Sequence, residues 1–379
     1  MIVLEKILQN STSSVLEDLL PKIEKDIKSE SNSYACAILN LSLFELLEDD
    51  KYLSQCIEQF QNIISDSHAN KYTSNVPRSH IAFLGQILVE KGFYHNIEKS
   101  REIDFELFEN TLAQIKLLRT DSYINFSNVL NYFSQNPQNQ LHVFFVEELI
   151  NQLFQVVKKD ELGSRIVQSD CVDLSFPYGM SGLLITLIKT YFYFSEDRKI
   201  KGIIDDGVKY ILNYKIDVDF SEKSYDFFPN HILGGGEKPI FSNQMSLSSG
   251  DLSKAFLFYQ YSKISDNANI LKLANFVGLN TLIRKAQHQH NVINSSFSNG
   301  SSGIAFMYHK MYQFSNIEAY KQGKVFWVEK TLEFLNNEKP SDYSQKFDIW
   351  EGKLGVNLAL LSCLTPKKLS WESIYGLSI

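Results

Sequence analysis

Long apolar runs are missing from this sequence of 379 residues. The longest candidate, GLLITLIKTYFYF at 182–194, is interrupted by Lys189 and falls short of the ~18 apolar residues of a membrane span. The start of the chain, MIVLEKILQN, places Glu5 and Lys6 where a signal peptide would be apolar. We therefore expect a cytoplasmic protein without a signal peptide or a transmembrane segment.

The sequence also contains few cysteines and has no excess of positive charge. The four cysteines are scattered and form no CxxC pair: Cys36, Cys56, Cys171 and Cys363. In a cytoplasmic protein such cysteines are expected to be reduced. With 37 Lys and Arg against 44 Asp and Glu, the net charge is -7 and no basic patch stands out, so nucleic-acid binding is not expected. A P-loop or dinucleotide-binding glycine motif is missing as well.

Helical periodicity, in contrast, is abundant. Most segments repeat apolar residues at the spacing of a helix, as in VFFVEELINQLFQVVKKDEL at 143–162, and strand patterns are poor. Only eight prolines occur, and Pro77 and Pro177 lie between periodic segments. The pattern predicts an all-α protein.

Four segments share one local design: a polar or aromatic loop, a glycine, two residues, a small residue and then an apolar helix. They read PYGMSGLLITLI, LSSGDLSKAFLFY, FSNGSSGIAFMY and IWEGKLGVNLALL, and their first glycines are Gly179, Gly250, Gly300 and Gly352. These glycines lie 71, 50 and 52 residues apart, and the longest gap contains a loop-rich insertion at 218–245. A glycine at the junction permits a positive φ or a close backbone approach. The second small residue, for example Gly303, lets the start of the helix pack tightly.

The period of about 50 residues predicts one helical hairpin per unit, with one inner and one outer helix. Units of this kind stack into a solenoid or close into a ring. Weaker copies without the glycines precede the four segments, so that about seven units would cover nearly the whole chain. We therefore predict a single domain over 1–379, with a helical lead-in at 1–32.

In order and spacing, these motifs resemble the glycine motifs of lanthionine synthetase C-like proteins, the cyclases of lanthipeptide biosynthesis. MSLSSGDLSKAFL is similar to the family's Trp-Cys-Tyr-Gly-Asp segment, and SSFSNGSSGIAFMYHKMYQF to its Cys-His-Gly segment. LSFPYGMSGLL and FDIWEGKLGVNLALLSCL resemble the repeats that carry a His-Gly and a Glu-Gly pair. The resemblance implies an α/α-barrel of seven helical hairpins. It also implies a zinc ion, held by two cysteines and a histidine, that activates a cysteine thiol for addition to dehydroalanine or dehydrobutyrine.

Carried over position by position, the resemblance does not extend to the residues that bind zinc or act as acid or base in the family. The two cysteine ligands fall on Ser248 and Ser298, the histidine ligand falls on Asn299, and the histidine of the His-Gly pair falls on Tyr178. The matching positions that keep the family residue are Gly179, Gly250, Asp251, Gly300 and Gly352. Neutral hydroxyls and an amide are poor zinc ligands. We therefore expect no bound zinc and no other cofactor.

The remaining polar residues have both chemical and structural interpretations. Tyr178, Asp251 and Glu351 are the candidate acids or bases, whereas capping of a helix start is the more common role for residues placed like Asp251 and Glu351, and packing is the usual role of a tyrosine such as Tyr178. His288 and His290 lie near the third motif and could in principle reach a metal, although an HxH pair in a polar loop is more often on the surface.

These observations leave open whether the chain is an enzyme, and three functions follow. The first is that of a catalytically degenerate relative that binds a precursor peptide or a dehydratase-type biosynthetic enzyme. The second reading is an active, zinc-independent cyclase that works by positioning and acid–base chemistry. The third is an interaction protein outside peptide modification. We expect a monomer, and we favour the first function because the loop glycines remain while all three metal ligands are replaced.

Overall fold

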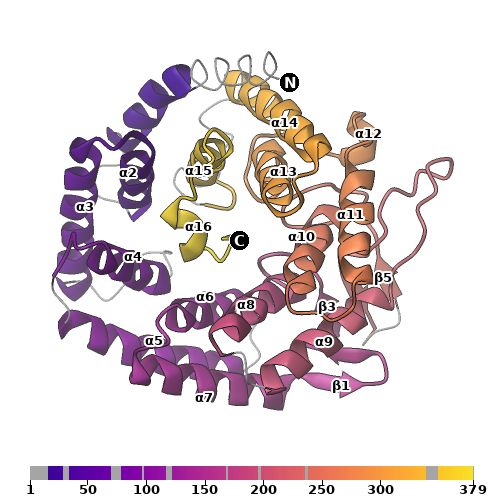
Figure 1. The fold of residues 1–379 in the computed structure, drawn as a ribbon, viewed down its shortest axis with the longest axis horizontal. Coiled ribbons are helices and arrows are strands. Elements are labelled where there is room, and N and C mark those ends of the chain that lie inside the picture. Colours follow the sequence, from indigo (N-terminus) through magenta and orange to yellow (C-terminus); the bar gives the residue numbers. More distant parts are fainter. Residues whose placement is uncertain are drawn as a thin grey trace.

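The computed structural model describes residues 16–28, 34–69, 78–95, 98–116, 122–167, 170–194, 198–234, 238–338 and 349–378. Two concentric rings of helices dominate these residues (Figure 1). The inner ring consists of α2 (Tyr34–Leu47), α4 (Arg78–Glu90), α6 (Ser122–Ser134), α8 (Met180–Tyr193), α10 (Asp251–Ser262), α13 (Ser301–Ser315) and α15 (Lys353–Cys363). The outer ring contains α3 (Asp50–Ala69), α5 (Glu98–Lys116), α7 (Gln140–Val156), α9 (Arg198–Leu212), α11 (Asn269–Thr281), α14 (Glu318–Asn337) and an unlabelled helix over 16–28.

The two rings differ in how their sequences distribute apolar residues. The inner helix α8 is buried continuously from Met180 to Thr190, because its apolar residues are spread around the helix and are not confined to one stripe. Its outer partner α9 buries one stripe that includes Ile200, Ile204 and Ile211, and its other faces meet solvent. The alternation of these two kinds of helix therefore builds a barrel whose core lies between the rings.

Contacts between neighbouring inner helices close the ring. From α4 to α15 each inner helix packs on the next, and α15 packs on α2. The remaining junction, between α2 and α4, is made by the rings of Tyr34 and His80, whose centroids are 6.1 Å apart. The predicted α/α-barrel of about seven hairpins is thus confirmed, including its weakly patterned first half.

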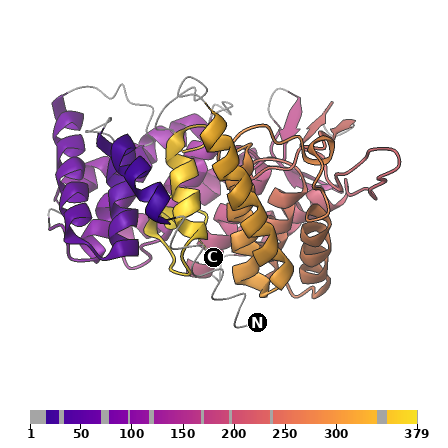
Figure 2. The ribbon, with the colours of Figure 1, turned by 90° about the horizontal axis from the view of Figure 1, so that it is seen from above.

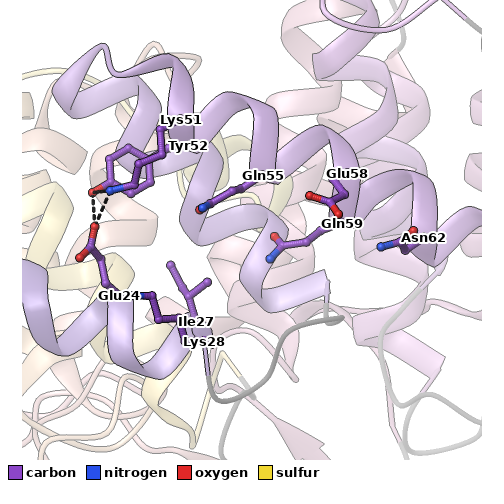
Figure 3. Close-up of a pocket in the computed structure, with 9 residues that line it drawn as sticks. All are labelled: Glu24, Ile27, Lys28, Lys51, Tyr52, Gln55, Glu58, Gln59 and Asn62. Atoms are coloured by element: carbon purple, nitrogen blue, oxygen red, sulfur yellow. Dashed lines mark hydrogen bonds and ion pairs between the residues drawn. The ribbon is translucent and has the colours of Figure 1, made fainter.

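The N-terminal helix at 16–28 serves as the outer helix of the last hairpin. Lys353 at the start of α15 is paired with Asp26 at 3.3 Å, and Glu24 accepts hydrogen bonds from Lys51 Nζ at 2.8 Å and Tyr52 Oη at 2.7 Å. Figure 3 shows the second contact at one end of a polar cavity of about 450 Å³ between this helix and α3. The described part of the predicted lead-in therefore belongs to the barrel, and the rest of 1–32 lies outside the described residues.

Five three-residue strands interrupt the helical pattern within the described ranges. β1 (Lys158–Asp160) and β2 (Gly163–Arg165) form an antiparallel hairpin, and β3 (Cys171–Asp173) is the edge of a sheet with the order β3-β4-β5. β4 (His231–Leu233) and β5 (Lys238–Ile240) come from the insertion at 218–245. The insertion thus carries a β-hairpin that pairs with the loop before α8, which strand patterns of three residues are too short to predict.

The last part of the chain enters the ring (Figure 1). The short helix α16 (Ser370–Ile374) contacts α2, α4 and α6, and Ser378 reaches the ends of α8 and α10 through Lys189 and Gln260. Because α8 and α10 end there, this is the opposite end of the inner helices from their glycine-rich starts. Seen from the side, the C-terminus lies toward one end of the barrel, and strands lie toward the other (Figure 2).

All four cysteines are free, and Cys36, Cys56 and Cys363 are buried, in line with their expected reduced state. A short α12 (Gln287–His290) completes the helices. Within the described ranges, every helix is too short or too polar to span a bilayer.

Candidate active site

The starts of α8, α10, α13 and α15 converge at one end of the barrel. Each of these helices has the first glycine of its motif as the N-cap residue: Gly179, Gly250, Gly300 and Gly352. Gly250 has φ of 75°, a conformation in which a side chain would be strained. The other three have φ near −100 to −113°, which any residue can adopt, so a positive φ explains only the second motif.

The small residue three positions later has a packing role. A Cβ atom on Gly303 would lie 1.8 Å from the carbonyl oxygen of Phe297, and one on Gly355 would lie 1.7 Å from that of Ile349. In both cases the loop before the helix passes directly over its first turn. The predicted close approach at Gly303 is therefore present, and it brings the loop residues before each helix to one place.

These loops border an open cavity of about 330 Å³. Its walls combine the helix starts with the β-hairpin of the insertion, and the lining residues are Ser175, Tyr178, Asn230, His231, Ile240, Ser242, Gln244, Ser248, Ser249, Ser298, Asn299 and Glu351. Most of the lining residues are of polar, uncharged types.

The three positions at which the sequence resemblance predicts metal ligands meet in this cavity and are hydrogen-bonded. Ser248 Oγ donates to Asn299 Oδ1 at 2.5 Å, and Asn299 Nδ2 donates to Glu351 Oε1 at 3.2 Å. Ser298 Oγ donates to the same Glu351 oxygen. Ser248, Ser298, Asn299 and Glu351, which we call the polar cluster, thus form one hydrogen-bonded group from three different loops.

Backbone hydrogen bonds and aromatic rings hold the loops in register. The N–H of Ser248 donates to the carbonyl of Ser298 at 3.0 Å, and the N–H of Ser298 donates to that of Trp350 at 2.8 Å. The buried ring of Trp350 stacks on Phe297 with a centroid distance of 5.8 Å, and it also contacts Tyr375. The polar cluster therefore rests on an aromatic floor that the C-terminal segment helps to build.

The three candidate acid–base residues fall into two environments. Tyr178 and Glu351 line the cavity, and the Tyr178 ring is 42% exposed and 6.1 Å from that of Trp350. Asp251 is fully buried and does not line the cavity. It accepts hydrogen bonds from the N–H groups of Phe227 and Phe228 and pairs with Arg284.

Asp251 belongs to a buried ionic network. Arg284 also pairs with Asp226 at 2.7 Å, and all three side chains are almost completely buried. Burial raises the pKa of Asp251, and the charge of Arg284 opposes this shift. This arrangement ties the insertion to the first residue of α10, which is a structural role beyond the helix capping that the sequence suggested.

The histidines outside the motifs lie elsewhere. The HxH pair is not at the cavity: His290 is 7% exposed, its Nδ1 accepts the N–H of Val292 at 3.0 Å, and its ring packs edge-on against Trp327. His290 is therefore a buried structural residue, whereas an HxH pair in a polar loop suggested a surface position. His288 lies beside Tyr225, with ring centroids 6.3 Å apart.

The polar cluster does not suit a zinc ion. Ser248, Ser298 and Asn299 offer two neutral hydroxyls and one amide, and Glu351 is the only carboxylate among them. Zinc in proteins is held by cysteine, histidine and carboxylate, usually three or four together. Across the described ranges, no group of three such side chains is arranged to hold a metal. The cluster is also already internally hydrogen-bonded, so we assign no chemistry to zinc here.

Sequence reasoning missed the contribution of the insertion to the cavity. Asn230, His231, Ser242 and Gln244 line it, and His231 Nδ1 lies 3.5 Å from the Asp173 carboxylate. The insertion contains no motif that would predict their place beside the helix starts, because only the pairing of β3 with β4 brings them there. His231 is the only imidazole among the lining residues, and it is 47% exposed.

Comparisons with known proteins agree with this architecture. A solved structure described as nisin cyclase superposes with a TM-score of 0.69 over 98% of both chains at 12% sequence identity, which shows a common α/α toroid. A search of curated protein sequences finds no match. The sequence profile of the family described as lanthionine synthetase C-like protein matches residues 146–375, which include all four glycine motifs and the cavity. Since this match covers more than half of the chain, the protein belongs to the lanthionine synthetase C-like family.

Proposed function

We propose that this protein acts in the maturation of a ribosomally synthesised peptide without zinc-dependent thioether formation. In this function the cavity binds a precursor peptide, or a biosynthetic partner that presents one, and the barrel serves as a binding module. The observation that supports the proposal is the polar cluster, in which Ser248, Ser298 and Asn299, the residues that the family resemblance aligns with metal ligands, converge and hydrogen-bond.

The cavity is suited to short, polar stretches of peptide. Its volume of about 330 Å³ is at the lower end of ligand pockets, which favours one or two residues over a long segment. Hydroxyl and amide groups from several loops offer both donors and acceptors, which suit peptide N–H and C=O groups. The exposed ring of Tyr178 at the same cavity can cover an apolar side chain.

The same residues argue against activation of a cysteine thiol. A free thiol has a pKa of about 8.5 and needs a positive neighbour, such as a metal ion, to become a thiolate at neutral pH. Here the charge of the polar cluster comes from the Glu351 carboxylate, which disfavours a second negative charge nearby. A cysteine in this cavity would therefore remain largely protonated and react slowly with a dehydrated residue.

Metal analysis of the purified protein tests this proposal. We expect far less than one zinc per chain in the unaltered protein. The triple variant S248C/S298C/N299H should bind about one zinc, because its three side chains occupy positions that already meet. Stoichiometric zinc that survives chelation of the unaltered protein would refute the proposal.

A zinc-independent cyclase is the second candidate function, favoured by the presence of Tyr178 and Glu351 at the same cavity as possible acid and base. A dehydrated precursor peptide, incubated with and without the protein and then alkylated at free thiols, separates the two functions. The binding function predicts an unchanged number of free thiols together with peptide association. A loss of free thiols that requires Glu351 would favour the cyclase instead.

A further inference from the structure

A third cavity lies among α3, α4, α5, α6 and α7 and shares no lining residue with the candidate active site. It has a volume of about 240 Å³ and opens between helices that neighbour one another around the ring (Figure 1). Its apolar wall is made by Phe60, Ile64, Ile81, Val89 and Ile103. These side chains can enclose a compact apolar group but leave no space for an extended chain.

A buried polar triad forms another part of the lining. Asp104 Oδ1 accepts a hydrogen bond from Tyr132 Oη at 2.9 Å, and its Oδ2 lies 3.0 Å from His142 Nε2. All three side chains are at least 97% buried. Burial beside Asp104 raises the pKa of Tyr132 well above its usual value, so the phenol remains the donor and the carboxylate the acceptor. Three polar groups so far from solvent point to a use beyond packing, since apolar residues would fill this space at lower cost.

Two polar atoms of the lining residues have no hydrogen-bond partner in the described part of the chain. They are His142 Nδ1 and Gln86 Oε1, and both are screened from solvent. His142 Nε2 faces the Asp104 carboxylate, which suits the tautomer with its proton on Nε2; in that tautomer Nδ1 is an acceptor, and the amide oxygen of Gln86 is an acceptor as well. Buried acceptors are nearly always paired, so two of them at one cavity indicate a missing donor.

The charges at this cavity select the kind of donor. Its lining contains the carboxylates of Asp104 and Glu90 and no Lys or Arg. Glu90 is exposed, and Gln86 Nε2 donates to it at 2.7 Å, which leaves the Gln86 oxygen beside a negative charge. A cation is favoured in such a field, and an ammonium group supplies three N–H donors.

We propose that this cavity binds a small primary amine carried on a compact aromatic or branched aliphatic body. The apolar body packs against Phe60 and its neighbours, and the ammonium group donates to His142 Nδ1 and Gln86 Oε1. This site is independent of the peptide-binding function proposed above. It gives the barrel a second ligand, bound between inner and outer helices rather than at the helix starts.

Titration with 2-phenylethylamine, followed by NMR of the full-length protein, tests the proposal. We expect saturable binding, at least about tenfold tighter than that of ethylbenzene, which has the same apolar body and lacks the amine. His142→Phe keeps a ring of similar size and removes the acceptor, and it should weaken binding about tenfold or more. Ala82→Phe, at a partly buried position of the lining, should fill the cavity and abolish binding.

Circular dichroism and thermal unfolding of each variant report whether the barrel remains folded. Ser248→Ala at the other cavity is the matched control and should bind the amine as the unaltered protein does. The proposal is overturned if no saturation occurs by about 10 mM amine. Equal affinity for ethylbenzene, or unchanged amine binding by both folded cavity variants, would overturn it too.

Discussion

Replacement of Gly303 by alanine should destabilise the barrel strongly, although alanine is the better helix former. A Cβ atom at this position would lie 1.8 Å from the carbonyl oxygen of Phe297 and 2.9 Å from the Cβ of Leu247. Carbon–oxygen contacts rarely fall below about 3 Å, so backbone must move by more than about 1 Å. Because that backbone belongs to the loop that carries Ser298, it cannot move without breaking the hydrogen bonds that join the loops.

The size of the effect follows from two opposing contributions. Overpacking of a rigid site costs about 1–3 kcal/mol, and a clash with backbone falls at or above the upper end of this range. The intrinsic preference of a helix for alanine over glycine offsets about 1 kcal/mol of this destabilisation at most. We therefore expect the free energy of unfolding to fall by about 2–3 kcal/mol in Gly303→Ala.

Gly202 provides the matched control. It lies inside α9, and a Cβ atom there would meet nothing within 4 Å. Gly202→Ala should therefore raise the free energy of unfolding by about 0.5–1 kcal/mol. Urea denaturation of both variants, followed by circular dichroism, measures the midpoints and slopes. If Gly303→Ala is as stable as Gly202→Ala, the close approach of loop and helix does not exist as described.

Three further predictions concern buried ionisable groups. Burial lowers the pKa of His309 to about 3, so between about pH 6.5 and pH 3 the unfolded chain binds a proton that the folded chain does not, and the free energy of unfolding falls as the pH falls through this window. His309→Phe should therefore reduce the loss of unfolding free energy between pH 7 and pH 5 by about 2 kcal/mol, and an unchanged dependence of stability on pH would contradict this. Arg284→Met leaves Asp251 buried without its cation and should cost about 3–5 kcal/mol in denaturant unfolding, so a cost below about 1 kcal/mol would contradict the buried network. Lys310→Met strands the buried carboxylate of Glu372, and the double variant with Glu372→Leu should recover most of the lost stability; a double variant as unstable as the single one would argue against the pair.

Much of the fold could be predicted because it depends on local periodicity. The apolar residues spread around the helix at 182–190 and the single apolar stripe of 198–212 already distinguish an inner from an outer helix. The role of the helix at 16–28 could not be read in the same way. Its pairing through Asp26 with Lys353 joins residues more than 300 positions apart, and no local pattern reports a ring closure.

The candidate site, too, could be predicted only where it depends on local motifs. Motif spacing places Ser248 and Ser298 two residues before the first glycine of successive repeats, with Asn299 directly after Ser298, and the structure brings all three into one hydrogen-bonded cluster with Glu351. For Asp251 the motif suggested a candidate acid or base, but its environment depends on Arg284, which no motif contains.

By itself, then, the sequence determined the helical repeat and the family resemblance, and it places serine and asparagine where the resemblance predicts metal ligands, because each of these depends on residue type and spacing along the chain. Only the tertiary structure decided which loops share a cavity, that the insertion forms one of its walls, and that a separate cavity with an apolar wall is lined by a buried Tyr132–Asp104–His142 triad. The physical reason is that burial and electrostatic environment arise from contacts between residues far apart in sequence. Periodicity can tell which face of a helix is buried, but not which side chain lies opposite it.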